Sequence, residues 1–182
     1  VQNQPDFQAG SADHRTHFVA AVPTLVRQAM AEYSALTGRE YSPVHTFMCD
    51  DAEMVMVGLG SVADDVEAVV THLRSQGKKV GVVSIKLLQP FPEAEVVAAL
   101  KGKKAVTVLE RSEQTALTTL VTQALFKGCE NASQMRHEGI PAIKTMPRLT
   151  TAIFGLGGHD LQPRHLIAAF KNMEGQGSSA PL

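Results

Sequence analysis

The sequence predicts an α/β protein with an open, mostly parallel sheet and helices on both of its faces. Apolar runs such as EMVMVG, KVGVVSIKLL and KAVTVLE alternate along the chain with amphipathic patterns of helical period. Strands that are apolar on both sides lie buried between helices, and helical crossovers join them in parallel with a right-handed turn. A chain of 182 residues with 44% apolar content can bury a core of this kind.

The beginning of the chain is expected to lead into this domain. Residues 1–21 show no sustained period and contain polar turn formers, so we expect them to be extended. Pro23 suits the first turn of a helix, whose apolar face repeats until Gly38. Residues 41–51 then read as a loop. We expect a lead-in with one helix at 1–48, an α/β domain at 49–173 and a flexible linker or tail at 174–182.

Strands and helices alternate in the middle of the chain. Apolar runs are predicted to be strands at residues 53–58, 79–88, 104–110 and 149–155. Helical patterns follow them at 62–77, 92–102, 117–128 and 163–173, and Pro or Gly marks most of their ends.

The segment at 129–147 breaks this rhythm. It carries Ile140, Ile143 and Met146 without a strand or helix period, and Pro141 forbids an uninterrupted helix. We expect this segment to be mobile or packed against a symmetry mate in the isolated domain, and to cover a neighbouring domain in a longer protein. The alternative is a short extra strand on its own sheet edge.

Composition excludes several classes of partner. The 17 Lys and Arg against 18 Asp and Glu leave no basic face, so nucleic acid is not expected. No apolar stretch approaches the roughly 20 residues that span a bilayer, so we expect a cytoplasmic protein without a membrane partner. Cys49 and Cys129 are too few and too far apart for an iron–sulfur cluster, and we expect reduced thiols. The start at Val1 and the linker-like end GQGSSAPL suggest a fragment of something longer.

The stretch VGLGSVADD resembles a dinucleotide fingerprint, with glycines at positions 58 and 60 and an alanine at position 63. The next strand, however, carries Lys86 near its end, where an acidic residue would bind the ribose; a lysine leaves an NADP site as an alternative. Strand–helix packing and helix capping explain the same turn without a nucleotide. Its glycines permit positive φ and a close strand–helix approach, while Ser61 caps the helix and Asp64 completes a capping box.

Other polar residues form no catalytic pattern. His14 and His17 lie three residues apart, and His159 and His165 flank a helix start, but neither pair has a carboxylate at metal-ligand spacing. Solvated or capping histidines are the expected outcome. We therefore expect no catalytic residue, no cofactor-binding residue and no metal ligand in this chain.

The run from Asp50 to Glu113 resembles the transketolase C-terminal-like domain of 2-oxoacid:ferredoxin oxidoreductases. The flanking segments ALTGREY, VQNQPDFQAG and FGLGGHDLQPRHLIAAFKNM are similar to those around this domain, domain II, in single-chain pyruvate:ferredoxin or flavodoxin oxidoreductases. Residues 80–109 also resemble decarboxylase β-subunits and transketolases, and so indicate only the domain type. One departure is that SEQTALTTLVTQALFKG follows the L-[DE]-R element, where the family often continues with Pro and Gly.

The resemblance implies a non-catalytic domain that contacts other domains of a dimeric enzyme making acetyl-CoA from pyruvate. It also implies that thiamine diphosphate, magnesium, iron–sulfur clusters and CoA bind in other domains, and that ferredoxin or flavodoxin accepts the electrons. Two alternatives stay open: a free-standing NAD(P)-binding module, and the C-terminal domain of a lipoate-linked 2-oxoacid decarboxylase β-subunit.

Contacts to other domains are expected at the carboxyl ends of the strands, where open α/β sheets present ligands and partners. Residues 88–91 belong to this edge, and Arg111 is the strongest single candidate because it emerges directly from an apolar strand. The candidate contacts are Gly58, Gly60, Ser61, Arg111, Ser112, Glu113, Gly155, Gly157, Gly158 and Asp160.

Overall fold

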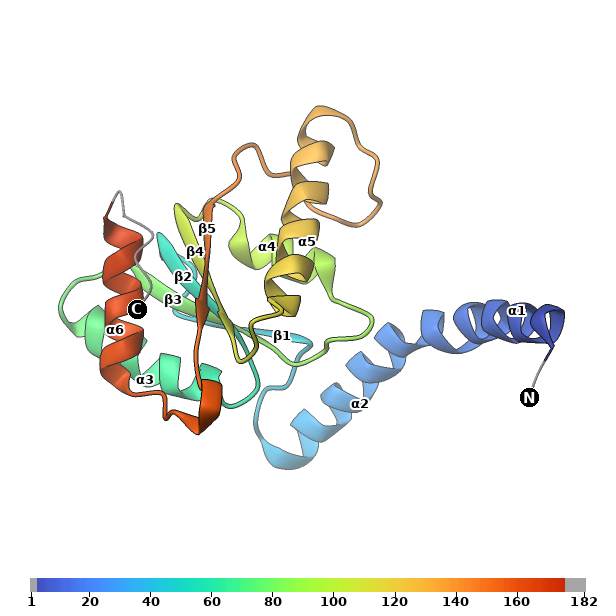
Figure 1. Cartoon of the computed structure of the whole chain (residues 1–182), viewed down its shortest axis with the longest axis horizontal. Coiled ribbons are helices and arrows are strands. Elements are labelled where there is room, and N and C mark those ends of the chain that lie inside the picture. Colours follow the sequence, from blue (N-terminus) through green and yellow to red (C-terminus); the bar gives the residue numbers. More distant parts are fainter. Residues whose placement is uncertain (1–2, 176–182) are drawn as a thin grey trace. The chain divides into compact units, whose positions relative to one another are not determined.

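The computed structural model describes residues 3–175 and divides the chain into two compact units (Figure 1). The first unit holds the chain up to Pro43 together with Leu87–Pro92, and the second holds Val44–Lys86 and the chain from Glu93 onward. Most of the tail expected at 174–182 lies outside the described residues.

The first unit is helical. It contains α1 (Gln4–Asp13), a π-helical turn (His14–Phe18), a 3-10 turn (Val19–Ala21) and α2 (Val22–Thr37), which ends at Gly38 with φ 68°.

The expectation of an extended segment at 1–21 was wrong for its described residues. The Asn3 side chain accepts a hydrogen bond from the Asp6 amide at 2.9 Å, and Pro5 occupies the first turn of α1. This helix buries none of its residues, so it lacks the apolar period by which a helix is found in a sequence. Local capping and a favourable first turn specify it instead.

The second unit contains a five-stranded sheet in the order β1-β3-β2-β4-β5, which confirms the predicted fold class. Its strands are β1 (Val44–Phe47), β2 (Met54–Leu59), β3 (Val80–Ile85), β4 (Ala105–Glu110) and β5 (Arg148–Ile153). All pairs are parallel except β1 with β3, in which Val44 lies opposite Ile85. The loop expected at 41–51 therefore contains a strand, which is short and only partly buried.

Two helical layers cover the sheet (Figure 1). Helices α3 (Val62–Ser75) and α6 (Pro163–Glu174) pack on one face, and α4 (Glu93–Leu100) and α5 (Ala116–Ser133) pack on the other. Strands β3 and β4 are buried at every position, as their uninterrupted apolar runs predict. Met56, Val66, Leu166 and Phe170 belong to the core between the sheet and the α3–α6 layer.

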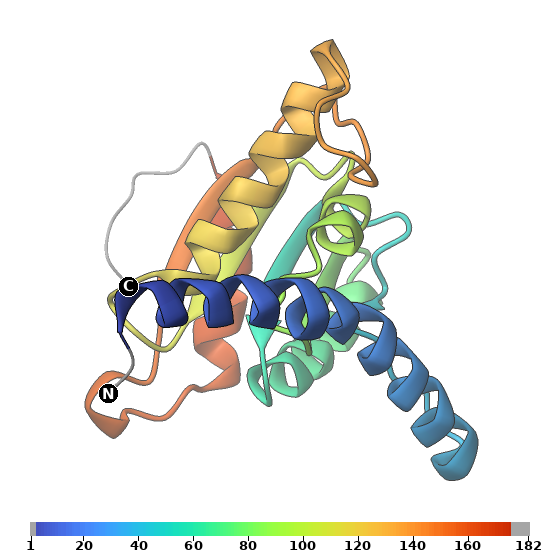
Figure 2. The same ribbon diagram turned by 90° about the vertical axis from the view of Figure 1, so that its right-hand side faces the viewer.

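The segment after α5 folds back along that helix (Figure 2). Helix α5 continues past Gly128 to Ser133, and the Ile143 amide donates to the Gly128 carbonyl at 3.0 Å. Ile140 and Ile143 are buried. The Asn131 amide group donates to the carbonyl oxygen of Ile140 at 2.8 Å. Ile140 and Ile143 thus pack onto their own domain, so the expectation that this segment covers a neighbouring domain was wrong. The segment also forms no strand, so the alternative of an extra edge strand was wrong as well.

Candidate functional site

The centre of the sheet contains a topological switch point. Strands β2 and β4 lie side by side, but the chain leaves β2 through α3 on one face and leaves β4 through α5 on the other. In open α/β sheets, the crevice outside the carboxyl ends of two such strands is the usual place for ligands and partners.

A cavity of about 530 Å³ lies at this crevice; we call it the switch-point cavity. The ends of β2 and β4, the starts of α3 and α5, and the loop between β5 and α6 surround it. Its lining residues are Leu59, Ser61, Val62, Asp65, Leu109, Glu110, Arg111, Leu117, Phe154, Gly155, Gly158, His159, Asp160, Leu161 and Gln162. A second, apolar cavity of about 500 Å³ adjoins it and shares the walls formed by Leu109, Phe154 and Leu161.

The structure brings half of the candidate contact residues together at this cavity. Those in its wall are Ser61, Arg111, Gly155, Gly158 and Asp160. Those outside its wall are Gly58, Gly60, Ser112, Glu113 and Gly157. Residues 88–91 belong to the first unit. A role in interdomain contact stays a prediction for all of these residues.

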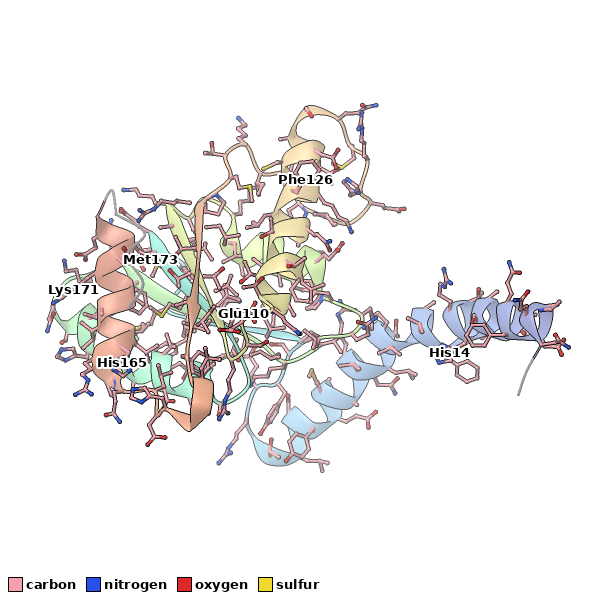
Figure 3. The ribbon with its side chains drawn as sticks, in the orientation of Figure 1. His14, Glu110, Phe126, His165, Lys171 and Met173 are labelled. Carbon is pink, nitrogen blue, oxygen red and sulfur yellow. The ribbon has the colours of Figure 1, made fainter. Side chains whose placement is uncertain are left out.

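Glu110 and Asp65 are carboxylates of this site that sequence reasoning missed, and Glu110 is the buried one. Glu110 is the last residue of β4 (Figure 3) and is only 7% exposed. One of its oxygens, Oε1, accepts the Thr118 amide hydrogen at 2.6 Å. Thr118 lies in the first turn of α5, so the carboxylate satisfies a free helix N–H group and faces the positive end of the helix dipole. The sequence feature that could have identified Glu110 is a carboxylate at the end of a mostly apolar strand.

Arg111 lies over Gly155 at the rim of the cavity. Gly155 has φ 71°, and a Cβ atom added there would lie 3.2 Å from the Arg111 Nε. The arginine thus occupies the space that a side chain at position 155 would need. Its guanidinium forms no hydrogen bond or ion pair with any residue between positions 3 and 175.

The glycine turn after β2 serves the packing of strand on helix, as the structural explanation predicts. Gly60 has φ 78°, and a Cβ at Gly58 would lie 3.0 Å from Val62 Cγ1. The predicted capping box is wrong, because the Ser61 side chain makes no cap hydrogen bond. Its backbone already has helical angles, φ −62° and ψ −20°, whereas a capping residue is usually extended. Ser61 lines the switch-point cavity instead.

Three of the histidines and cysteines, His159, His165 and Cys49, make contacts that stabilise the fold. His165 caps α6, since its Nδ1 accepts the Gln162 amide hydrogen at 3.2 Å, as expected for a capping histidine. Its ring stacks on His159 with centroids 6.0 Å apart. Burial raises the pKa of the Cys49 thiol, which donates to the carbonyl oxygen of Val82. Across residues 3–175, no group of three or more His, Cys, Asp and Glu side chains could hold a metal ion.

Comparison with known proteins identifies the domain type. Residues 52–166 match the family described as pyruvate:ferredoxin oxidoreductase core domain II. The pyruvate synthase subunit PorA of Methanothermobacter thermautotrophicus is 32% identical over 82% of this chain and 35% of its own length. The pyruvate-flavodoxin oxidoreductase of Klebsiella pneumoniae is 33% identical over 93% of this chain and 14% of its own length. The chain therefore spans only a part of these relatives.

Solved structures agree on the fold. A 2-oxoglutarate:ferredoxin oxidoreductase from Magnetococcus marinus aligns with a TM-score of 0.54 and 22% identity over 78% of this chain and 21% of its own. A split-gene transketolase aligns with a TM-score of 0.51 and 18% identity over 74% of this chain and 42% of its own. The family match covers every element from β2 to the start of α6, including the walls of the switch-point cavity. This chain belongs to the pyruvate:ferredoxin oxidoreductase core domain II family.

Proposed function

We propose that this chain is a non-catalytic domain of a 2-oxoacid oxidoreductase that converts pyruvate to acetyl-CoA in the cytoplasm and reduces ferredoxin or flavodoxin. The observation that carries the proposal is the family match over residues 52–166, together with relatives of which this domain forms 14% to 35%. In this proposal the parent enzyme is a dimer.

The parent's thiamine diphosphate, magnesium, iron–sulfur clusters and CoA bind in other domains. The switch-point cavity does not suit a diphosphate, because Asp65, Glu110 and Asp160 give it more negative than positive charge. Cys49 lies in the loop between β1 and β2 and is buried, and Cys129 lies in α5, so the two free cysteines are in different parts of the fold. The residues of this chain would therefore position other domains rather than hold a reacting group.

The contact with those domains is assigned to the carboxyl edge of the sheet. Strands β3 and β4 are fully buried and hold this edge rigidly, and the loop between β5 and α6 extends it. A rigid edge with a cavity can fix the orientation of a neighbouring domain, which is what a thiamine enzyme needs to keep its reacting groups in place.

Activity measurements test the proposal. We expect the intact parent enzyme to reduce methyl viologen with pyruvate and CoA, and this chain by itself to show no reduction above the rate without protein. Pyruvate-dependent reduction by the chain alone would overturn the non-catalytic role. A parent sequence with a lipoate-linked partner and no cluster-binding cysteines would favour the decarboxylase alternative.

A further inference from the structure

We infer that the switch-point cavity receives a basic side chain from a neighbouring domain of the parent enzyme, and that Glu110 is the buried anion that pairs with it. The inference rests on the proposed function, since that function supplies the neighbouring domain. It names the chemistry of the contact: a guanidinium or ammonium group enters between the ends of β2 and β4.

The first observation is a carboxylate oxygen without a partner in a buried side chain. Glu110 is 7% exposed, and its Oε1 accepts from the Thr118 amide, but its Oε2 accepts from no group of residues 3–175. In that part of the chain, no fully shielded side-chain oxygen lacks a hydrogen bond. The Oε2 atom is therefore not fully shielded, and Glu110 is part of the cavity wall. A carboxylate oxygen with so little exposure to water is stabilised when a charged donor binds it.

The second observation is the charge of the cavity. Asp65, Glu110 and Asp160 line it against a single cation, Arg111. Neither Asp65 nor Asp160 forms an ion pair with Arg111 or with any other residue from position 3 to 175. Three carboxylates against one guanidinium leave the wall with an excess of negative formal charge, which the N-termini of α3 and α5 offset by only about half a charge each. A cationic group is therefore the electrostatic complement of the cavity.

The walls favour a long side chain over a metal ion. Within residues 3–175 no cluster has the ligands for a metal. The two cavities share a wall to which Leu109, Phe154 and Leu161 contribute apolar side chains, beside Gly155, His159 and Asp160. The methylene stem of Arg or Lys can pack against these apolar side chains while its head group reaches Glu110. The occupant belongs to the rest of the parent enzyme, because this chain covers only 14% of the matched pyruvate-flavodoxin oxidoreductase and 35% of the matched pyruvate synthase subunit.

Hydrogen exchange of the intact parent enzyme, compared with this chain alone, tests the inference. The amides of residues 156–161 should exchange more slowly in the intact enzyme, because the inserted side chain holds the loop between β5 and α6. E110Q keeps the shape and the Oε1 acceptor for Thr118 but removes the charge. It should speed exchange of this loop by about ten-fold in the intact enzyme, the effect of losing one charged partner.

Salt provides a readout that a merely structural Glu110 would not change. Raising NaCl from about 0.1 to 1 M should speed exchange of the loop in the wild-type enzyme and have little effect in E110Q, because added ions screen a charge pair. D65N and D64N form a matched pair of controls. Both residues are exposed in the first turn of α3, but only Asp65 lines the cavity, so D65N should weaken protection and D64N should not.

Several results would overturn the inference. One is equal protection of residues 156–161 in wild type and E110Q; another is protection that is lost in R111Q but kept in E110Q, which would mean that the neighbour brings a carboxylate. If E110Q does not fold, the double variant D65N/D160N replaces it with the same expectations. The proposed function has a separate readout. If the intact enzyme shows no pyruvate-dependent viologen reduction, the proposed function fails, whatever the hydrogen exchange of residues 156–161 shows.

Discussion

The Ile143 amide donates a hydrogen bond to the Gly128 carbonyl at 3.0 Å and so fastens the segment after α5 onto that helix. This contact requires position 128 to lack a side chain. A Cβ there would lie 2.9 Å from Val97 Cγ1 and 3.1 Å from Ile143 Cγ1. The glycine is therefore a packing residue in the middle of a helix and not a helix end.

Gly128→Ala should destabilise the α/β unit by about 1–3 kcal/mol, because the added methyl group has no room between α4 and the returning segment. Urea unfolding followed by circular dichroism measures this. Gly10→Ala is the control, since position 10 lies within α1 and has no atom within 4 Å of the added Cβ. It should raise helix content slightly, as alanine is preferred over glycine in helices. Equal stability of Gly128→Ala and wild type would contradict the packing role.

Arg111→Ala should leave the isolated chain folded, because its guanidinium bonds to no residue from 3 to 175; the change in unfolding free energy should stay within about 0.5 kcal/mol. In the intact enzyme it should lower turnover by about two- to five-fold, as expected for a partly exposed charge at an interface. Steady-state viologen reduction measures this, with Arg39→Ala in the other unit as the control. Unchanged kinetics would remove Arg111 from the contact surface.

Acid should weaken the anchor of the loop between β1 and β2. The Arg74 guanidinium pairs with the Asp51 carboxylate at 2.7 Å and also donates to the carbonyl oxygens of Met48 and Val80. The hydrogen bond from Arg74 to Asp51 lowers the pKa of the Asp51 carboxyl. A lowered folded-state pKa means that the stabilisation is present above the unfolded pKa and is lost as pH falls through the folded value. Thermal midpoints of wild type should therefore fall more steeply than those of Asp51→Asn as pH drops below about 4. If the thermal midpoints of wild type and Asp51→Asn fell in parallel with pH, the Asp51 carboxylate would contribute nothing to the pH dependence of stability.

Nicotinamide nucleotides should not bind. The turn at Gly58 and Gly60 is explained by packing, the adjacent cavity is negatively charged, and Lys86 is not part of its wall. We expect calorimetric titration with NADP or NAD to give no binding at micromolar concentration. Micromolar affinity for either would restore the interpretation as a nucleotide-binding module.

The parts of the fold that could be predicted are those in which sequence period follows burial. Strands β3 and β4 are mostly apolar because both of their faces are covered, and the buried residues of α3 recur with a helical period. The elements that were missed have little buried surface: α1 buries nothing, and β1 is a short edge strand.

The site could be predicted only in outline. The rule for carboxyl ends of strands located Arg111 and Asp160, but strand order, which decides where the switch point lies, cannot be read from one sequence. Glu110 and Asp65 were overlooked because a carboxylate in a first helical turn or at a strand end is usually solvated. Only the structure distinguishes the carboxylate that is buried.

The α/β unit is not continuous in sequence, and this limits how the protein can be cut. Leu87–Pro92 groups with the N-terminal helices, where the Leu87 amide donates to the Pro43 carbonyl at 3.3 Å and Gln89 shares a cavity wall with Phe7 and His14. A truncation that starts at Val44 would keep residues 87–92 but remove the chain they pack against. Protein engineers who want a minimal sheet domain should therefore shorten this excursion between β3 and α4 as well, and not only trim the N-terminus.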